Sequence, residues 1–142
     1  MRTWKPRRPV VLIVDDDPDI LHVLGLILAA EGCDVREALS GAEALAALDR
    51  VDVLIVDQRM PQMFGTELVV AAQAQGFMGR VLLISGSDDV RTQAGSARID
   101  SFLAKPIGPQ RLMREIERLF YLNIHTRRTN REQRSSEIPL KA

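Results

Sequence analysis

The chain has 142 residues, the usual size of one compact domain, and 46% of them are hydrophobic, an ordinary value for a globular protein. A single cysteine, Cys33, excludes an internal disulfide and fits a reducing cytoplasm, and no apolar segment approaches the length that crosses a membrane. The formal net charge is zero, but residues 10–124 carry ten basic and seventeen acidic groups, which argues against a nucleic-acid-binding face on this part of the chain.

Charge and apolar patterning divide the chain into three parts. Residues 1–9 form a basic N-terminal segment, residues 10–124 form the domain, and residues 125–142 form a polar, basic C-terminal tail or the start of a linker. We expect both ends to be solvated, with weak contact to nucleic acid as the alternative. The tail is predicted to be a frayed helix end or a flexible segment.

Five short apolar runs predict the strands. They are Val10–Val14, Cys33–Ala38, Val53–Val56, Val81–Ile84 and Ser101–Leu103. Helical patterns lie between these runs, and strands that alternate with helices favour a parallel sheet with helices on both faces. The sequence therefore predicts an α/β fold.

Caps mark the first two helices. The first is expected to begin at Pro18 with Asp17 as its N-cap, and Gly32 is expected to end it. The second opens at Ser40–Glu43, a pattern typical of a capping box, and is expected to carry Leu45 and Leu48 on its apolar face.

The later helices are less regular in sequence. The third begins near Gly65, and the fifth begins at Pro109 and loses its apolar pattern after Ile124. The fourth, at about residues 88–97, contains Gly95 and offers few apolar side chains, so we expect it to be short or irregular.

Polar side chains follow four of the five predicted strands. They are Asp15, Asp16, Asp17, Asp57, Ser85 and Lys105. The carboxyl ends of parallel strands share one edge of the sheet, and ligands bind there in folds of this class. We therefore expect these groups to converge.

The converging groups suggest a reaction. Asp15, Asp16 and Asp57 would repel one another and raise one another's pKa values, and a hard divalent cation with oxygen ligands, such as Mg²⁺, would relieve this. Lys105 can pair with a carboxylate or with a phosphate. A metal, an ammonium group and a hydroxyl around one carboxylate predict phosphoryl transfer, in which the attacking carboxylate becomes an acyl phosphate.

The sequence resembles the response regulator receiver domains of two-component signalling, over roughly Val10 to Phe120. The similarity is carried by four motifs in chain order, namely Val11–Ile20, Asp57–Leu68, Leu83–Gly86 and Phe102–Pro106. The resemblance implies a flavodoxin-like, doubly wound sheet of five parallel strands in the order 2-1-3-4-5, with five helices.

The resemblance also implies roles for individual residues. Asp57 would be the phosphoacceptor, supplied by a sensor histidine kinase or a phosphotransfer protein. Mg²⁺ would be bound by the carboxylates of Asp16 and Asp57, by the backbone carbonyl of Arg59, and by Asp15 through a water molecule. The protein would be a signalling module and not an enzyme, apart from its own aspartyl phosphorylation and dephosphorylation.

Further positions complete the implied switch. Ser85 and Lys105 would bind the phosphoryl group, and Phe102 would turn inward on activation. Pro106 would follow a cis peptide bond that aims Lys105 inward, and Gly65 would supply a turn conformation. The implied protein acts in the cytoplasm with no membrane contact, its output partner is unspecified, and a homodimer is one option.

Two other interpretations stay open. In a haloacid-dehalogenase-like phosphatase, Asp15 and Asp17 would be nucleophile and acid, but Asp57–Pro61 would have no role. The second interpretation is a binding module with the receiver fold that signals without phosphate. It would be favoured if acidic residues were missing from the site.

Overall fold

The computed structural model describes residues 1–86 and 97–137 of the chain. Its elements are β1 (Val10–Val14), α1 (Pro18–Ala30), β2 (Asp34–Ala38), α2 (Gly41–Leu45), β3 (Val53–Asp57), α3 (Gly65–Ala74), β4 (Arg80–Ser85), β5 (Ser101–Ala104) and α4 (Pro109–Glu137). All five predicted strands are confirmed, each within one residue of its expected bounds.

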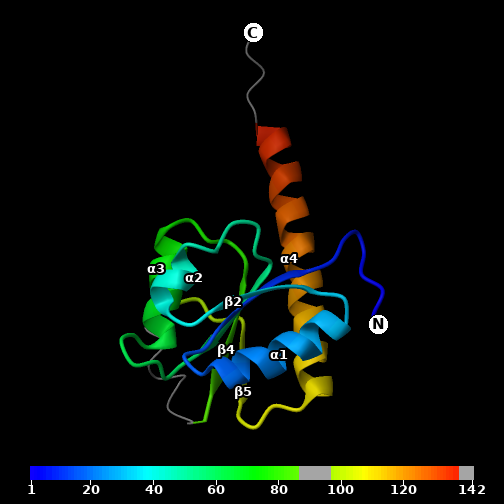
Figure 1. Cartoon of the computed structure of the whole chain (residues 1–142). Helices are drawn as coiled ribbons and strands as arrows, with labels where there is room; N and C mark the ends of the chain where they lie inside the picture. The colour runs from blue at the N-terminus through cyan, green and yellow to red at the C-terminus, as the bar shows by residue number, and fades with distance from the viewer. Residues whose placement is uncertain (87–96, 138–142) are drawn as a thin grey trace.

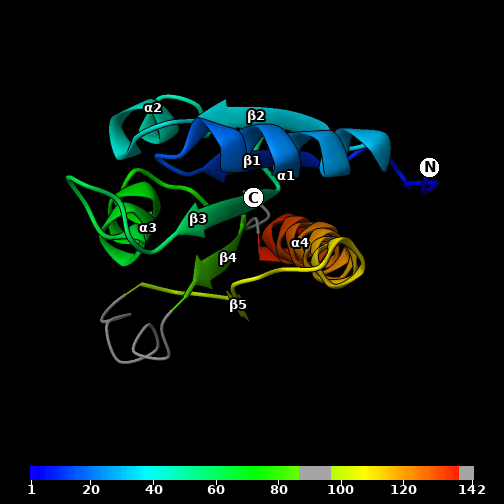
Figure 2. The same cartoon turned by 60° about the horizontal axis from the view of Figure 1, so that its bottom comes forward.

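The strands form one parallel sheet in the order β2-β1-β3-β4-β5, as expected. Alternate residues of each strand point to opposite faces, so the sheet has two hydrophobic cores. Helices α1 and α4 cover one face, where Leu28 and Ile116 are fully buried, and α2 and α3 cover the other, where Ala44 and Leu68 are fully buried (Figures 1 and 2). This is the flavodoxin-like, doubly wound arrangement that the sequence predicts.

The predicted ends of α1 are confirmed. The Asp17 carboxylate accepts a hydrogen bond from the backbone N–H of Asp19 at 2.9 Å, and Pro18 is the first helical residue. Beyond the helix, Gly32 adopts a φ of +91°, a left-handed conformation that favours glycine. The chain can therefore turn directly from α1 into β2.

Helix α2 is shorter than predicted. The Ser40 side chain accepts from Glu43 N at 3.2 Å, but the helix ends at Leu45, so the expectation that it carries Leu48 is wrong. The chain has to turn back before β3, and Arg50 takes part in that turn with a φ of +63°. The early end of α2 leaves the amino-terminal end of β2 without a helix on the face of the sheet that α2 and α3 cover (Figure 2).

Two further helices, α3 and α4, follow β3 and β5. Helix α3 begins at Gly65, as predicted, and the expected helix at about residues 88–97 lies almost wholly outside the described residues. Helix α4 continues past Ile124, where the apolar pattern stops, to Glu137. Residues 110–137 contain neither glycine nor proline, so no helix breaker ends it earlier. In the described part of the chain, no helix combines the length and apolar character needed to cross a membrane.

The N-terminal segment packs on the domain, so the expectation that it is solvated is wrong. Trp4 is only 9% exposed, and its indole Nε1 donates to the carbonyl of Glu31 at 2.7 Å. Its ring meets Phe120 edge-on, with centroids 5.6 Å apart, and stacks on Tyr121 at 6.2 Å. The segment is therefore part of the core that α4 closes.

A buried carboxylate fixes the same segment in place. Asp52 is fully buried, and both of its oxygens accept from the guanidinium of Arg7, at 2.7 and 2.8 Å. It also accepts from Val10 N at 2.8 Å and from the Asn123 side chain at 3.1 Å. One side chain thus joins the N-terminal segment, β1 and α4.

Candidate functional site

The predicted polar residues converge at the carboxyl edge of the sheet. Asp15 and Asp16 follow β1, and Asp57 ends β3, the neighbouring strand. Carboxylate oxygens of these three residues lie within 4.8 Å of one another. The Lys105 ammonium, in the loop after β5, lies 3.2 Å from Asp57 Oδ1. The fold therefore gathers three acids and one base from separate parts of the chain.

The acidic group is electrostatically unfavourable without a cation. Asp15 and Asp57 are 3% and 7% exposed, whereas Asp16 is exposed to solvent. Burial raises the pKa of the Asp15 carboxyl, and the charges of Asp57 and Asp16 raise it further. A hydrogen bond from Asp17 N, at 2.9 Å, and the charge of Lys105 act in the opposite direction on this pKa. A cation among the three carboxylates would relieve the repulsion.

The donor set fits a hard divalent cation. All three side chains offer carboxylate oxygens, and no soft sulfur or imidazole ligand belongs to this group in the described part of the chain. Oxygen ligands of this kind suit Mg²⁺ or Ca²⁺. The exposed position of Asp16 leaves one side of the group open to solvent, where a partner could approach.

The loop after β3 leaves no room for a side chain at Gly65. A Cβ atom there would lie 2.5 Å from the carbonyl oxygen of Asp57 and 2.8 Å from a methyl group of Val56. Gly65 is not among the residues with positive φ, so the reason for glycine is close contact and not the turn conformation that we expected. The absence of a side chain lets α3 begin directly against Asp57.

Two residues that the sequence analysis did not single out hold this loop. The buried Gln58 accepts from Thr66 N at 3.0 Å through its side chain, and its backbone carbonyl accepts from Gly65 N at 2.9 Å. Its N–H donates to Ile84 O at 2.9 Å, which links the loop to β4. A glutamine directly after a predicted strand, with a threonine in the first turn of the next predicted helix, is the pattern that could have indicated this role.

The remaining predicted residues lie on β4 and β5. Ser85 is buried at the end of β4, and its carbonyl accepts from Lys105 N at 2.9 Å. The peptide bond between Lys105 and Pro106 is cis. Phe102 aligns with Leu83 in the parallel ladder and is half-buried against the core under α2 and α3. Side chains two residues apart on a strand share a face, so Ser85 and Phe102 belong to the same face of the sheet.

The position of Asp17 bears on the phosphatase interpretation. Its carboxylate caps α1 and lies outside the group formed by Asp15, Asp16 and Asp57. The acid that such a phosphatase requires is thus engaged as a helix cap.

Comparison with known proteins agrees with this geometry. The model of the response regulator receiver domain family matches residues 11–117. The transcriptional regulatory protein GlrR of Escherichia coli (strain K12) is 40% identical over 111 residues, which are 75% of this chain and 25% of GlrR. The transcriptional regulatory protein PrrA of Mycobacterium tuberculosis is 36% identical over 115 residues, which are 78% of this chain and 49% of PrrA. The chain thus spans only a quarter to a half of these curated relatives.

Solved structures give the same result. Chemotaxis protein CheY4 of Vibrio cholerae superposes with a TM-score of 0.74 at 30% identity, over 79% of this chain and 98% of that one. A CheY-like receiver domain protein of Methanospirillum hungatei superposes with a TM-score of 0.78 at 28% identity, over 84% and 98% of the two chains. The fold, the acidic edge and the family match lead to one conclusion: this chain belongs to the response regulator receiver domain family of two-component signalling.

Proposed function

We propose that Asp57 is the phosphoacceptor of this receiver domain and that a histidine kinase or a phosphotransfer protein is its donor. The observation that carries the proposal is the position of Asp57, which lies within 4.8 Å of two further carboxylates and 3.2 Å from the Lys105 ammonium. In the reaction, a carboxylate oxygen of Asp57 attacks phosphorus while the bond from phosphorus to the donor nitrogen breaks.

Mg²⁺ is the proposed cofactor. Asp15, Asp16 and Asp57 would hold it, together with the backbone carbonyl of Arg59, two residues after the acceptor. When bound, it supplies positive charge that offsets the negative charge of the transferring oxygens. The same charge would also relieve the repulsion that raises the Asp15 pKa.

Lys105 and Ser85 are the proposed phosphoryl-binding residues. Lys105 already faces Asp57, so its ammonium can move from the carboxylate to an oxygen of the new phosphoryl group. Ser85 ends β4, the strand next to β3, and its backbone carbonyl accepts a hydrogen bond from Lys105 N. The two residues can therefore move together. Autodephosphorylation would use the same groups to position a water molecule.

Phe102 is the proposed output of the switch. Its ring is half-buried on the face of the sheet that also holds Ser85, so inward movement of Ser85 would leave space for it. The phosphoryl group shifts this equilibrium only through contacts that differ between the two states, and those contacts come from Ser85 and Lys105. Charged hydrogen bonds contribute roughly 1.5–3 kcal/mol each, enough to reverse a two-state balance of similar size.

Intact mass measurement tests the acceptor. Incubation with Mg²⁺ and a small acyl phosphate should add one phosphoryl mass to the native chain and none to Asp57→Ala. Asp49→Ala is the matched control, because the Asp49 side chain is 92% exposed and lies outside the acidic group. Labelling that persists in Asp57→Ala would place the acceptor elsewhere.

Amide exchange with a beryllofluoride phosphate mimic tests the switch. The native chain should change its protection at residues 81–86 and 101–105. Ser85→Ala should lose that change, although the mass measurement should still show a phosphoryl group added to Asp57. Ser101→Ala is the control, because the Ser101 hydroxyl bonds to Glu115 and not to the site. Unchanged protection in the native chain would refute the switch even if Asp57 accepts phosphate.

A further inference from the structure

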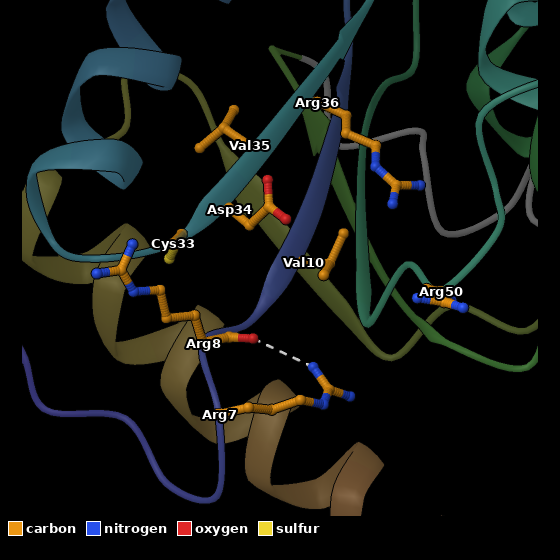
Figure 3. Close-up of a pocket in the computed structure, with 8 residues that line it drawn as sticks. All are labelled: Arg7, Arg8, Val10, Cys33, Asp34, Val35, Arg36 and Arg50. Atoms are coloured by element: carbon orange, nitrogen blue, oxygen red, sulfur yellow. Dashed lines mark hydrogen bonds between the residues drawn. The ribbon is translucent and has the colours of Figure 1, made fainter.

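A hollow lies at the amino-terminal edge of the sheet, at the opposite end of the strands from the acidic group. Its volume is about 830 Å³, and its lining includes Arg7, Arg8, Arg36 and Arg50 together with Val10 and Asp34, the first residues of β1 and β2 (Figure 3). We call this hollow the arginine pocket. It is distinct from the proposed phosphoryl site, with which it shares no residue.

The pocket exists because α2 is short. Val10 pairs with Asp34 in the parallel ladder, and Arg36 lies on the same face of β2 as Asp34. Helix α2 ends at Leu45 and lies toward the carboxyl end of β2, so it does not cover these residues (Figure 2). The turn that contains Arg50 then borders the open space.

The arginines of the pocket differ in how far their charge is already offset. Arg7 is paired with the buried carboxylate of Asp52 and adds little net charge. Arg36 donates to the carbonyls of Ala47, at 3.0 Å, and Asp49. These acceptors are neutral, so they orient the Arg36 guanidinium without cancelling its charge.

Arg50 and Arg8 add charge at the rim. The Arg50 side chain is 85% exposed and lies 3.9 Å from Asp49, a long contact between two exposed groups that contributes little. Figure 3 shows the guanidinium groups of Arg7, Arg36 and Arg50 around the space next to Val10, with the Arg8 side chain extending on the side of Cys33. The pocket thus holds an excess of positive charge against the single carboxylate of its lining, Asp34.

We propose that the arginine pocket binds an oligophosphate anion, either free or as the phosphate chain of a nucleotide. Guanidinium groups match phosphate oxygens in a two-point geometry, and Arg36 is already held in place for such a contact. The volume falls within the range of small-molecule sites. The basic residues form one concave cluster on a body of net negative charge, which favours a compact anion over a nucleic acid strand, whose backbone needs a longer basic track.

Calorimetric titration of the metal-free 142-residue chain with sodium tripolyphosphate at low salt tests the proposal. We expect one binding site whose affinity falls as sodium chloride is added. Arg36→Gln should weaken binding about tenfold or more, and Arg50→Gln about fivefold because that side chain is exposed. Asp34→Asn should tighten binding, since it removes the opposing charge.

Two controls separate this site from general charge and from the phosphoryl site. Arg114→Gln removes the same charge from an exposed position on α4 and should leave the affinity unchanged. Asp57→Ala should also leave it unchanged, so the two proposals can fail independently. Titration with ATP distinguishes the source of the anion: tighter binding than that of tripolyphosphate assigns a nucleotide, and equal or weaker binding assigns the phosphate chain alone.

Three outcomes would overturn the proposal. One is the absence of binding at millimolar tripolyphosphate, and another is an equal loss of affinity in Arg50→Gln and Arg114→Gln. The third is tighter binding of a single-stranded DNA oligonucleotide, with the same loss in Arg50→Gln, which would make the pocket part of a nucleic-acid surface. Arg50→Gln keeps the test valid if Arg36→Gln does not fold, because the Arg50 side chain is 85% exposed.

Discussion

The ammonium nitrogen of Lys105 lies 3.2 Å from Oδ1 of Asp57, although β4 separates the strands that these residues follow or end. The Lys105 side chain is about one-third exposed to solvent, and the Asp57 side chain is nearly buried. Lys105 therefore offsets part of the charge that a metal ion would otherwise offset. Ammonium and metal compete for the same carboxylate.

This competition predicts that Lys105→Met tightens Mg²⁺ binding. A partly exposed ion pair contributes roughly 0.5–1 kcal/mol, so the dissociation constant should fall about two- to fivefold. The measurement is Mg²⁺ titration by calorimetry, with Lys5→Met as the control, because Lys5 is exposed and lies in the N-terminal segment. Weaker Mg²⁺ binding in Lys105→Met would show that the lysine helps to assemble the acidic group instead of competing with the cation.

The buried acid Asp15 should make stability depend on pH in the absence of metal. Its folded-state pKa is raised, first by burial, so the native state keeps this proton to a higher pH than the unfolded state does. Between the ordinary and the raised pKa, stability falls as pH rises. Asp15→Asn should therefore stabilise the metal-free chain at neutral pH, and the gain should vanish below the ordinary carboxyl pKa of about 3.9.

Urea unfolding in a chelator, repeated at several pH values, measures this effect. Asp49→Asn, at an exposed position, should keep the pH dependence of the native chain and gain no stability at neutral pH. Added Mg²⁺ should stabilise the native chain more than Asp15→Asn and so remove the advantage of the variant. A gain in Asp15→Asn that is the same at low and neutral pH would contradict the explanation from charge.

The close contact at Gly65 predicts that adding a single methyl group there destabilises the fold and disturbs Asp57. Gly65→Ala would place a Cβ 2.5 Å from Asp57 O, so the loop or β3 must shift, at a cost of about 1–3 kcal/mol. Since the shift falls on the acceptor residue, the rate of phosphoryl labelling should fall as well. Gly108→Ala is the matched control, because nothing lies within 4 Å of the corresponding Cβ position. Equal stability and labelling in the two variants would contradict the tight packing.

Trp4 predicts that the first residues of the chain contribute to stability. Trp4→Ala removes a nearly buried ring that contacts Phe120 and Tyr121, and should lower the free energy of unfolding by roughly 3 kcal/mol. Thr3→Ala, at an exposed residue of the same segment, should have no measurable effect. Urea unfolding followed by far-UV circular dichroism makes the comparison, and equal midpoints would mean that the segment is not packed on the domain.

The sequence predicted the sheet well for a local reason. β-Branched runs and their polar ends are encoded by neighbouring residues, so the sequence alone places Asp57 at the end of a strand and beside Asp15. The N-terminal segment was different: Trp4 is a lone aromatic among basic residues, and its partners Phe120 and Tyr121 lie at the other end of the chain. A periodic pattern of apolar residues does not predict a contact between such distant positions of the chain.

The length of α2 and the role of Gly65 show the same limit. Leu48 continues the apolar spacing of α2, but the helix ends at Leu45 because the chain must return to β3, which only the three-dimensional arrangement imposes. Gly65 was correctly placed at the start of a helix, yet its reason is the approach of Asp57, set by packing across the loop. The sequence therefore predicted the local chemistry of each element, but it did not predict the distances between elements.

The length of helix α4 has a mechanical consequence for its own carboxyl end. It contains 29 residues and is about 43 Å long, more than twice the roughly 17 Å of a five-residue strand. Thr126 still accepts a hydrogen bond from Arg80 at 2.6 Å, and the part beyond Thr126, about 16 Å long, projects from the body as a straight arm (Figure 1). A tilt of about 10° in the packed part would displace the far end by about 3 Å, and an axial rotation would reach Glu137 undiminished. The length of the arm thus enlarges a small tilt of the packed part at the far end of the helix.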